Sequence, residues 1–253
     1  METQQQAQSK KFKILVIGDS CTDEYIYGDV TRLNPESPVP ILEHATTVTK
    51  KGMAANVYNN VLAFGCDADL ITNEEEITKT RYIDRKSKQH LLRVDKETEI
   101  KPAEYIDTSD YDAVIISDYN KGFVTWKTID QILDQSDIPV FLDTKKDDLI
   151  WFTGCFIKIN EIEYNNCTSL PTHNIIVTLG NKGAMYDGEL YPAKKVDVVD
   201  VCGAGDTFLA ALCIQYLETN NMEQAIQFAN KASAITVQHS GVYALTKEEI
   251  GTL

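Results

Sequence analysis

An α/β fold with a mostly parallel central sheet and helices on both faces is predicted from two patterns in this 253-residue sequence. Short, β-branched apolar runs recur along the chain, and each ends in a polar residue or glycine, as buried parallel strands do. Helical apolar spacing lies between these runs, and strands alternating with helices are typical of a parallel sheet inside three layers. We therefore expect one three-layer α/β/α domain with a small β-strand flap, or lid.

The predicted strands begin close to the N-terminus. Residues 12–17 form the first apolar run, which ends at Gly18-Asp19. Runs of the same kind follow at residues 113–116, 140–142, 156–159 and 175–177. Apolar residues near i, i+4 spacing predict helices over residues 54–64 and 126–133, and two successive helices from Asp206 onward. The chain is thus expected to end in helices.

Two stretches, residues 25–49 and 80–96, break this rhythm. Apolar and polar residues alternate in them, which is typical of exposed antiparallel strands. We expect these segments to form the lid over the carboxyl edge of the sheet. Residues 1–11 are polar and are expected to be a tail, so that residues 12–253 make a single domain.

The charge and cysteine content exclude several classes of protein. Asp and Glu number 38 against 24 Lys and Arg, and the resulting net charge of −14 opposes binding to nucleic acid or an anionic membrane. The six cysteines form no C-x-x-C pair, so neither a zinc site nor a disulfide framework is indicated. No signal peptide or membrane-crossing run is visible, and we expect a cytoplasmic protein with no nucleic-acid or membrane partner.

The segment Asp200-Val-Cys-Gly-Ala-Gly-Asp-Thr-Phe208 is the most informative one for chemistry. Backbone N–H groups at Gly203, Ala204 and Gly205, just before a long apolar helix, can form an anion hole. Asp206 in the first turn can then accept a proton from a hydroxyl beside that hole, with the helix dipole favouring its carboxylate form. The alternative is a tight turn with Asp206 as a helix cap. A dinucleotide site is disfavoured because Phe208 stands where the third glycine of G-x-G-x-x-G belongs.

Two further strand ends carry candidate ligand residues. Asn160-Glu-Ile-Glu163 places an amide and a carboxylate on one helical turn, which suits a hydrated Mg²⁺ beside a phosphate or, alternatively, a helix cap. Thr178-Leu-Gly180-Asn-Lys-Gly183 is a glycine-bearing turn that suits either close approach to a nucleotide or entry into a hairpin.

Taken together, these motifs resemble those of the ribokinase-like (PfkB) sugar kinases. Gly52-Met-Ala-Ala-Asn56 resembles the first family signature, Asn160 to Glu163 the N-x-x-E motif, and Asp200 to Phe208 the second signature with its G-A-G-D core. Residues 18–28, 32–40, 77–81, 92–95 and 117–122 are similar to the branch that phosphorylates D-glycero-β-D-manno-heptose 7-phosphate. The resemblance runs from about Phe12 to the C-terminus.

The resemblance implies an ATP- and Mg²⁺-dependent phosphoryl transfer to the anomeric hydroxyl of that sugar phosphate. It makes Asp206 the base and Gly203, Ala204 and Gly205 the anion hole. Glu163, with Asn160, would hold Mg²⁺ through water. The implied nucleotide-binding residues are Asn160, Thr178, Gly180, Gly183, Asn230 and Lys145, and the resemblance also allows a monovalent cation such as K⁺.

The implied sugar site carries hydroxyl-binding and phosphate-binding groups. Asp23, Gly52 and Asn56 match the family's sugar-binding positions, with Asp19 and Asp118 as helpers. A substrate that already carries a phosphate needs cations, and Lys121, Arg93 and Arg32 are the candidates because they fall in the heptose-specific segments. For each of the three, a solvated surface role is the alternative.

Several features depart from the family pattern. Met53 replaces a glycine of the usual G-G-A-A-N, and Cys202 replaces a threonine as a tolerated small residue or, less simply, a redox-sensitive thiol. Residues are missing after Thr72 and between Glu163 and Asn174, so we expect reduced helical cover over the sheet.

The expected partners are ATP, a sugar phosphate, a second copy of the chain paired through the lid, and a separate nucleotidyltransferase acting downstream. The alternatives are a kinase for another sugar, sugar phosphate or nucleoside, and a non-catalytic regulator that binds nucleotide or sugar.

Overall fold

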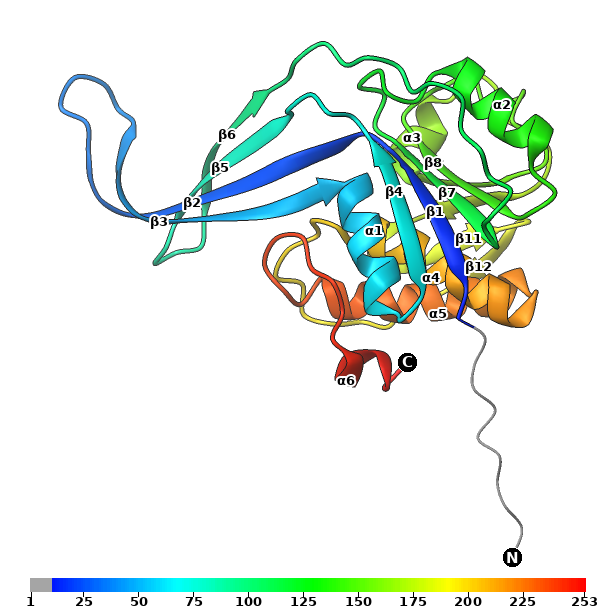
Figure 1. The fold of residues 1–253 in the computed structure, drawn as a ribbon. Coiled ribbons are helices and arrows are strands. Elements are labelled where there is room, and N and C mark those ends of the chain that lie inside the picture. Colours follow the sequence, from blue (N-terminus) through cyan, green and yellow to red (C-terminus); the bar gives the residue numbers. More distant parts are fainter. Residues whose placement is uncertain (1–10) are drawn as a thin grey trace, which may run out of the picture.

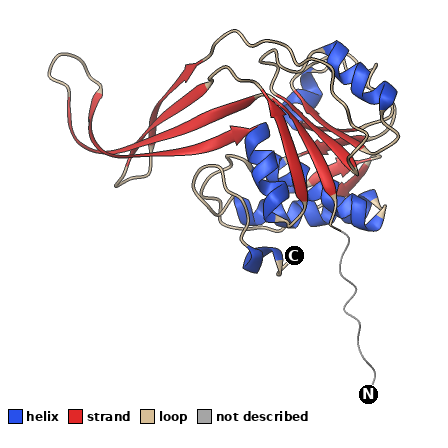
Figure 2. Cartoon of the chain, viewed as in Figure 1, coloured by secondary structure: helices blue, strands red, loops and turns tan. Residues whose placement is uncertain are grey.

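The structure is a computed structural model that describes residues 11–253. Of the expected tail, residues 1–10 lie outside the described residues. The described chain forms an α/β body from which an arm of strands extends, as Figure 2 shows.

The body is built on an eight-stranded sheet with the order β12-β11-β10-β9-β8-β7-β1-β4. Neighbouring strands from β4 to β10 run parallel, and β11 and β12 add an antiparallel edge. The predicted parallel sheet is therefore confirmed. The strands are β1 (Lys13–Gly18), β4 (Asp67–Thr72), β7 (Ala113–Asp118), β8 (Val140–Thr144), β9 (Phe156–Asn160), β10 (Ile175–Thr178), β11 (Ala184–Tyr186) and β12 (Glu189–Tyr191).

Helices cover both faces of this sheet (Figure 1). One face packs against α1 (Ala54–Ala63), α4 (Ala204–Thr219) and α5 (Met222–Thr236), and the other against α2 (Trp126–Gln135) and the short α3 (Glu161–Asn166). A 3₁₀ turn η1 (Gly180–Lys182) and a last helix α6 (Lys247–Ile250) complete the fold. Residues 206–214 of α4 are buried without interruption, because this helix lies between α1, α5 and the sheet.

The lid is a separate four-stranded sheet with the order β3-β2-β5-β6. Its strands are β2 (Ser20–Leu33), β3 (Pro40–Met53), β5 (Thr78–Asp84) and β6 (His90–Lys96). The hairpins β2–β3 and β5–β6 are antiparallel as expected, but β2 and β5 pair in parallel. The strands also begin before the predicted segments, since β2 follows directly on β1 at the edge of the body.

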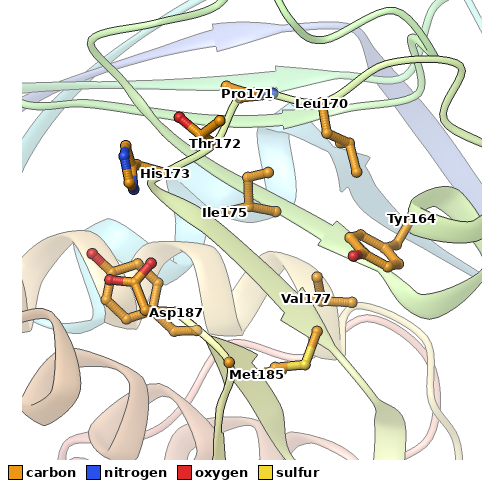
Figure 3. A pocket seen from close by; sticks show the side chains of 11 residues that line it. Tyr164, Leu170, Pro171, Thr172, His173, Ile175, Val177, Met185 and Asp187 are labelled. Carbon is orange, nitrogen blue, oxygen red and sulfur yellow. The ribbon is translucent and has the colours of Figure 1, made fainter.

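The helical cover is reduced where residues were expected to be missing. Only residues 73–77 connect β4 to β5, and α3 has six residues. Beside α3, a groove of about 240 Å³ opens over β10 and β11. Figure 3 shows the residues that line this groove, among them Ile175 and Val177 on β10, Met185 on β11, and Tyr164 and Leu170. Among the described residues, no helix is long and apolar enough to span a membrane.

Candidate active site

The predicted polar residues gather at the carboxyl edge of the sheet. Strand register pairs Asp118 with Thr144, Asp143 with Lys158, and Asn160 with Thr178, so the ends of β7, β8, β9 and β10 lie side by side. The first turn of α4 brings Asp206 to this edge, and α1 brings Asn56. The candidate site lies in the crevice outside strand ends, where open α/β sheets usually bind ligands.

Asp206 is at the centre of this cluster. The residue is 4% exposed, and its carboxylate accepts two hydrogen bonds, from Asn56 Nδ2 to Oδ2 (2.8 Å) and from the Tyr119 hydroxyl to Oδ1 (2.9 Å). Burial raises the pKa of Asp206 to about 6, and the nearby Asp143 adds to the rise, while Asn56, Lys158 and Tyr119 oppose it. The helix dipole alone therefore does not keep this pKa low. A carboxyl with a pKa near 6 suits a general base at neutral pH.

A chain of hydrogen bonds between buried polar side chains holds Asn56 in place. Asn60 donates from Nδ2 to the Asn56 carbonyl oxygen (2.9 Å) and accepts from the Thr207 hydroxyl (3.1 Å). Thr236 on α5 donates to Thr207 (3.0 Å). Because these groups are buried and hydrogen-bonded, they fix the positions of α1, α4 and α5 relative to one another next to Asp206.

The N-terminus of α4 has the geometry of an anion hole. Gly203 is the N-cap with φ 78°, a left-handed conformation that favours glycine. Ala204 N–H donates to the Val201 carbonyl (3.3 Å), whereas among the described residues no acceptor contacts the N–H groups of Gly205 and Asp206. Gly203 N–H likewise has no acceptor among the described residues, so of the predicted donors only Ala204 N–H is occupied, and Asp206 N–H is a further free donor.

A buried ion pair lies directly against this helix terminus. Lys158 Nζ and Asp143 Oδ2 are 2.6 Å apart, and both side chains are 5% exposed. A Cβ on Gly205 would come within 3.0 Å of Lys158 Nζ, which places the ammonium beside the free N–H groups. Asp143 Oδ1 is buried and has no hydrogen-bond partner among the described residues.

Asn160 and Glu163 form a capping box at the start of α3. Asn160 Oδ1 accepts from Glu163 N–H (2.9 Å), and Glu163 Oε2 accepts from Asn160 N–H (2.8 Å). Glu163 Oε1 also pairs with Lys145 Nζ, which lies 3.8 Å from Asp143 Oδ1. Lys145 therefore links the N-x-x-E turn to the Asp143–Lys158 pair.

The turn after β10 serves as a hairpin entry, one of the two interpretations of its sequence. Gly180 begins η1 with φ 59°, and Gly183 ends it with φ 108°, where a Cβ would lie 2.1 Å from the Tyr191 carbonyl oxygen. Thr178 is at the end of β10 beside Asn160. Asn230, on α5, donates from Nδ2 to that same carbonyl of Tyr191 (2.8 Å) and is 6% exposed.

On the lid side, Asp23 is paired with Arg81 across β2 and β5. The two side chains are 5% and 9% exposed. Gly52 on β3 makes this arrangement possible, because a Cβ there would lie 2.0 Å from Asp23 Oδ2. Arg81 Nη2 also contacts Cys202 Sγ (3.6 Å), and burial raises the pKa of that thiol, which disfavours the reactive thiolate.

Met53 adopts a backbone conformation that favours glycine. Its φ of 61° and ψ of −134° lie outside the regions open to most side chains, and it is 3% exposed at the start of α1. Its Sδ accepts from Lys79 Nζ (3.4 Å). The residue that replaces the family's glycine is therefore strained and fills space next to the lid.

The carboxylates of Asp19 and Asp118 have their hydrogen-bond and ion-pair partners within the protein. Asp19 is fully buried and accepts from the N–H groups of Tyr119 (2.8 Å), Lys121 (3.2 Å) and Phe123 (3.1 Å). Asp118 pairs with Lys146 Nζ (2.6 Å) and is 1% exposed. Both carboxylates fix the loop after β7.

The three predicted phosphate-binding cations differ in placement. Lys121 pairs with Glu97 (2.5 Å), and Arg93 with Asp95 (2.9 Å) on the lid strand β6, directly across from Arg81. Arg32 is exposed near the end of β2, nine residues and about 30 Å of strand beyond Asp23. The structure does not bring Arg32 to the cluster.

Sequence reasoning assigned no role to four residues that the structure brings to the site, namely Tyr119, Asp143, Lys158 and Lys79. Lysine and aspartate within buried β-strand runs were the available signal for Asp143 and Lys158, since buried charges need a partner. Lys79 has no carboxylate partner among the described residues, and its ammonium lies over the Tyr119 ring, 5.3 Å from the centroid.

The sequence places this fold and this cluster of residues in a family of carbohydrate kinases. Residues 69–249 match the model of the pfkB family carbohydrate kinases, and the chain belongs to that family.

Curated relatives agree with this membership, and solved structures agree with the fold. The chain is 30% identical to the bifunctional protein HldE of Nitratiruptor sp. and 31% identical to that of Helicobacter acinonychis, over 95% of its length in each case. It spans 64% and 66% of the lengths of those relatives. The fold is similar to ribokinase from Thermotoga maritima (TM-score 0.69, 19% identity, 95% of this chain and 98% of that one). It also resembles Arabidopsis thaliana ribokinase complexed with ribose and ATP (TM-score 0.69, 16% identity, 96% and 98%).

Proposed function

We propose that this chain transfers the γ-phosphate of ATP to the anomeric hydroxyl of D-glycero-β-D-manno-heptose 7-phosphate. The observation that carries the proposal is the buried Asp206 carboxylate beside the free N–H groups of α4. The heptose-specific sequence segments and the HldE relatives support this choice of acceptor. The product would be the 1,7-bisphosphate of the heptose. This compound would be used in the synthesis of ADP-heptose, which is a precursor of lipopolysaccharide.

In this mechanism Asp206 takes the proton of the acceptor hydroxyl as that oxygen attacks the γ-phosphate in line. Asn56 orients the carboxylate through the 2.8 Å hydrogen bond to Oδ2. Charge on the transferring group is stabilised by the N–H groups at the start of α4 and by Lys158 beside them. Thr178, Gly180, Gly183 and Asn230 would line the nucleotide side.

The residues near Glu163 fit a hydrated Mg²⁺. Asp143 offers a buried carboxylate oxygen that lacks a hydrogen-bond partner among the described residues, and Glu163 and Asn160 are close by on the same edge. Mg²⁺ commonly keeps several water ligands and is bound through one or two carboxylates, so a few oxygen-bearing side chains are enough to hold it. When bound, Mg²⁺ neutralises charge on the β- and γ-phosphates. A monovalent cation such as K⁺ belongs to the same proposal and is checked by comparing rates in K⁺ and Na⁺.

Acceptor binding is proposed for the lid side of Asp206. Asp23, held by Arg81 above Gly52, would bind sugar hydroxyls, and Arg93 and Lys121 would bind the phosphate already on the sugar. Asp19 and Asp118 would act by fixing the loop that carries Lys121.

A kinase for another acceptor is the second candidate, and Met53 favours it. This side chain stands where the family has a glycine, and its Sδ contacts Lys79 of the lid strand β5. An assay that couples ADP release to a panel of heptose, hexose and pentose phosphates, free sugars and nucleosides separates the two. We expect the highest kcat/KM with heptose 7-phosphate. A higher value for another acceptor would overturn the choice of substrate. Ligand-induced thermal stabilisation without ADP from any acceptor would identify a binding regulator.

A homodimer through the lid is part of the proposal. Leu92 and Val94 on β6 are 57% and 46% exposed, and their cross-strand neighbours Tyr82 and Thr80 share that face. Pairing two lids would cover these side chains. Light scattering at micromolar concentration should give twice the chain mass, and a monomer mass would contradict the dimer.

We propose that residues 11–253 carry the kinase activity and that nucleotidyl transfer to the product is carried out by other residues, in a separate nucleotidyltransferase. A cytoplasmic location belongs to the same proposal, because ATP is the phosphate donor.

A further inference from the structure

We propose that Tyr119 is a positioning residue for the base of the reaction, because its hydroxyl fixes the Asp206 carboxylate and favours its ionised form. This inference rests on the proposed function. The direct contact is the 2.9 Å hydrogen bond from Tyr119 to Asp206 Oδ1, on the oxygen opposite the one that Asn56 holds. Two donors from separate elements thus set the plane of one carboxylate and leave its remaining lone pairs for the acceptor hydroxyl.

The loop that carries Tyr119 is held at its backbone. Asp19 accepts from the N–H groups of Tyr119, Lys121 and Phe123, and Asp118 accepts from Asn120 N–H (2.8 Å). Two buried carboxylates therefore fix the segment that aims the phenol at Asp206. This tether explains the role of both carboxylates without any contact between them and a sugar.

The ring of Tyr119 is also held, by two cations from different parts of the fold. Lys79 on the lid strand β5 and Lys145 after β8 place their ammonium groups 5.3 Å and 5.2 Å from the ring centroid. Cations over an aromatic face are attracted to it. Tyr119 therefore lies where the lid meets the carboxyl edge, next to the base.

The electrostatic surroundings make this hydrogen bond important. The charged and titratable groups that act on Asp206 are Asp143 on β8, Lys158 on β9, Lys145 after β8 and Cys21 on β2. Burial and Asp143 raise the pKa of Asp206, while Asn56, Lys158 and Tyr119 lower it. Burial also raises the pKa of Tyr119 well above its ordinary value, so the phenol remains a donor at every pH of interest.

The test is the pH dependence of kcat/KM for the acceptor in Tyr119→Phe. Loss of a hydrogen bond to a charged group is expected to move the acid limb to higher pH by about one to two units. Activity below the limb should then fall about 10- to 100-fold, and activity above it should approach that of the wild type. A merely structural role would lower the rate by the same factor at every pH. That result, or an unshifted limb, would overturn the proposal.

Tyr111→Phe is the matched control, because Tyr111 donates to Asp69 Oδ2 over the same distance, 2.9 Å, away from the site. Its acid limb should coincide with that of the wild type. Asp19→Asn keeps the phenol but weakens its tether, and should shift the limb in the same direction by less. This variant keeps the proposal testable if Tyr119→Phe does not fold.

A readout without turnover separates this proposal from the proposed function. The carboxyl carbon of Asp206 can be followed by NMR in ¹³C-aspartate-labelled protein and assigned by its absence in Asp206→Asn. Its titration should move to higher pH in Tyr119→Phe. If the wild type phosphorylates no acceptor, the proposed function fails, while this titration still decides the role of Tyr119. An unchanged titration would rule out the electrostatic role.

Discussion

At the scale of single residues, the acceptor side of the site depends on the space above Gly52. The Asp23 carboxylate occupies the volume that a side chain would need, and Arg81 holds it there in a buried ion pair. The next residue, Met53, carries a side chain in a conformation that favours glycine. Two adjacent positions therefore show how closely β3 approaches β2 and the start of α1.

Gly52→Ala is expected to destabilise the fold by about 1–3 kcal/mol and to raise KM for the acceptor. The new Cβ would lie 2.0 Å from Asp23 Oδ2 and 2.8 Å from Cys21 Sγ, so the ion pair must shift. Urea denaturation and acceptor kinetics measure the two effects. Gly251→Ala is the control, since its nearest atoms are 3.4 Å away and its φ is −63°. Equal stability of the two variants would contradict this packing.

Asp206 should make the wild type less stable as the pH rises. Burial raises its pKa from 3.8 to about 6, so the folded state favours the protonated form. That contribution is complete below about pH 4 and is lost as the pH rises through 6, in total on the order of 3 kcal/mol. The Asp206→Asn variant has no carboxyl at this position, so its stability does not fall with the ionisation of residue 206. Its unfolding free energy relative to the wild type should therefore increase between pH 4.5 and 7.5 in urea titrations. A difference independent of pH would contradict the raised pKa.

At the scale of elements, local sequence predicted the buried strands and long helices because the apolar pattern of each segment reflects the burial of its own residues. Strands β1, β7, β8, β9 and β10 are short apolar runs, and α1 and α2 have one apolar face. Strand β4 was not predicted, because Asp67-Ala-Asp alternates at a half-exposed sheet edge, and β11 and β12 have only three residues each. Such edge strands are specified by their neighbours and not by their own sequence.

The site was predictable where glycines and motif residues are contiguous, as in Gly203 to Asp206. It was not predictable where it depends on pairing across strands. Lys158 faces Asp143 only because β8 and β9 are adjacent in register, and Tyr119 reaches Asp206 across 87 residues. Contacts of this kind follow from topology, which a single sequence does not state.

The capping box of α3 gives an element-scale test of the Mg²⁺ proposal. Glu163→Gln keeps an acceptor for the Asn160 N–H but removes the charge that pairs with Lys145. The Mg²⁺ concentration for half-maximal rate is expected to rise about 10- to 100-fold, with little change in melting temperature. Glu161→Gln is the control, since Glu161 is exposed and pairs only with Lys182 among the described residues (3.5 Å). Equal Mg²⁺ dependence of the two variants would rule out this role for Glu163.

At the scale of the whole molecule, the net charge of −14 does not describe the site. Lys158, Lys145, Lys79 and Arg81 lie around Asp206, Glu163 and Asp23, so local cations offset local carboxylates where phosphates are expected to bind. The reduced cover, in contrast, borders the cluster only at α3, whose first turn holds Asn160 and Glu163. The short α3 and the short β4–β5 connection expose sheet surface but leave the first turn of α4 and its partners intact.

Turnover by Asp206→Asn tests the central claim most directly. With ATP, Mg²⁺ and heptose 7-phosphate, we expect kcat to fall about 10²- to 10⁴-fold because the base is lost, while the Kd for ATP stays near that of the wild type. Asp197→Asn, which changes an exposed carboxylate in the segment before α4, should retain wild-type kcat. Near-normal turnover in Asp206→Asn would contradict the assignment of Asp206 as the base.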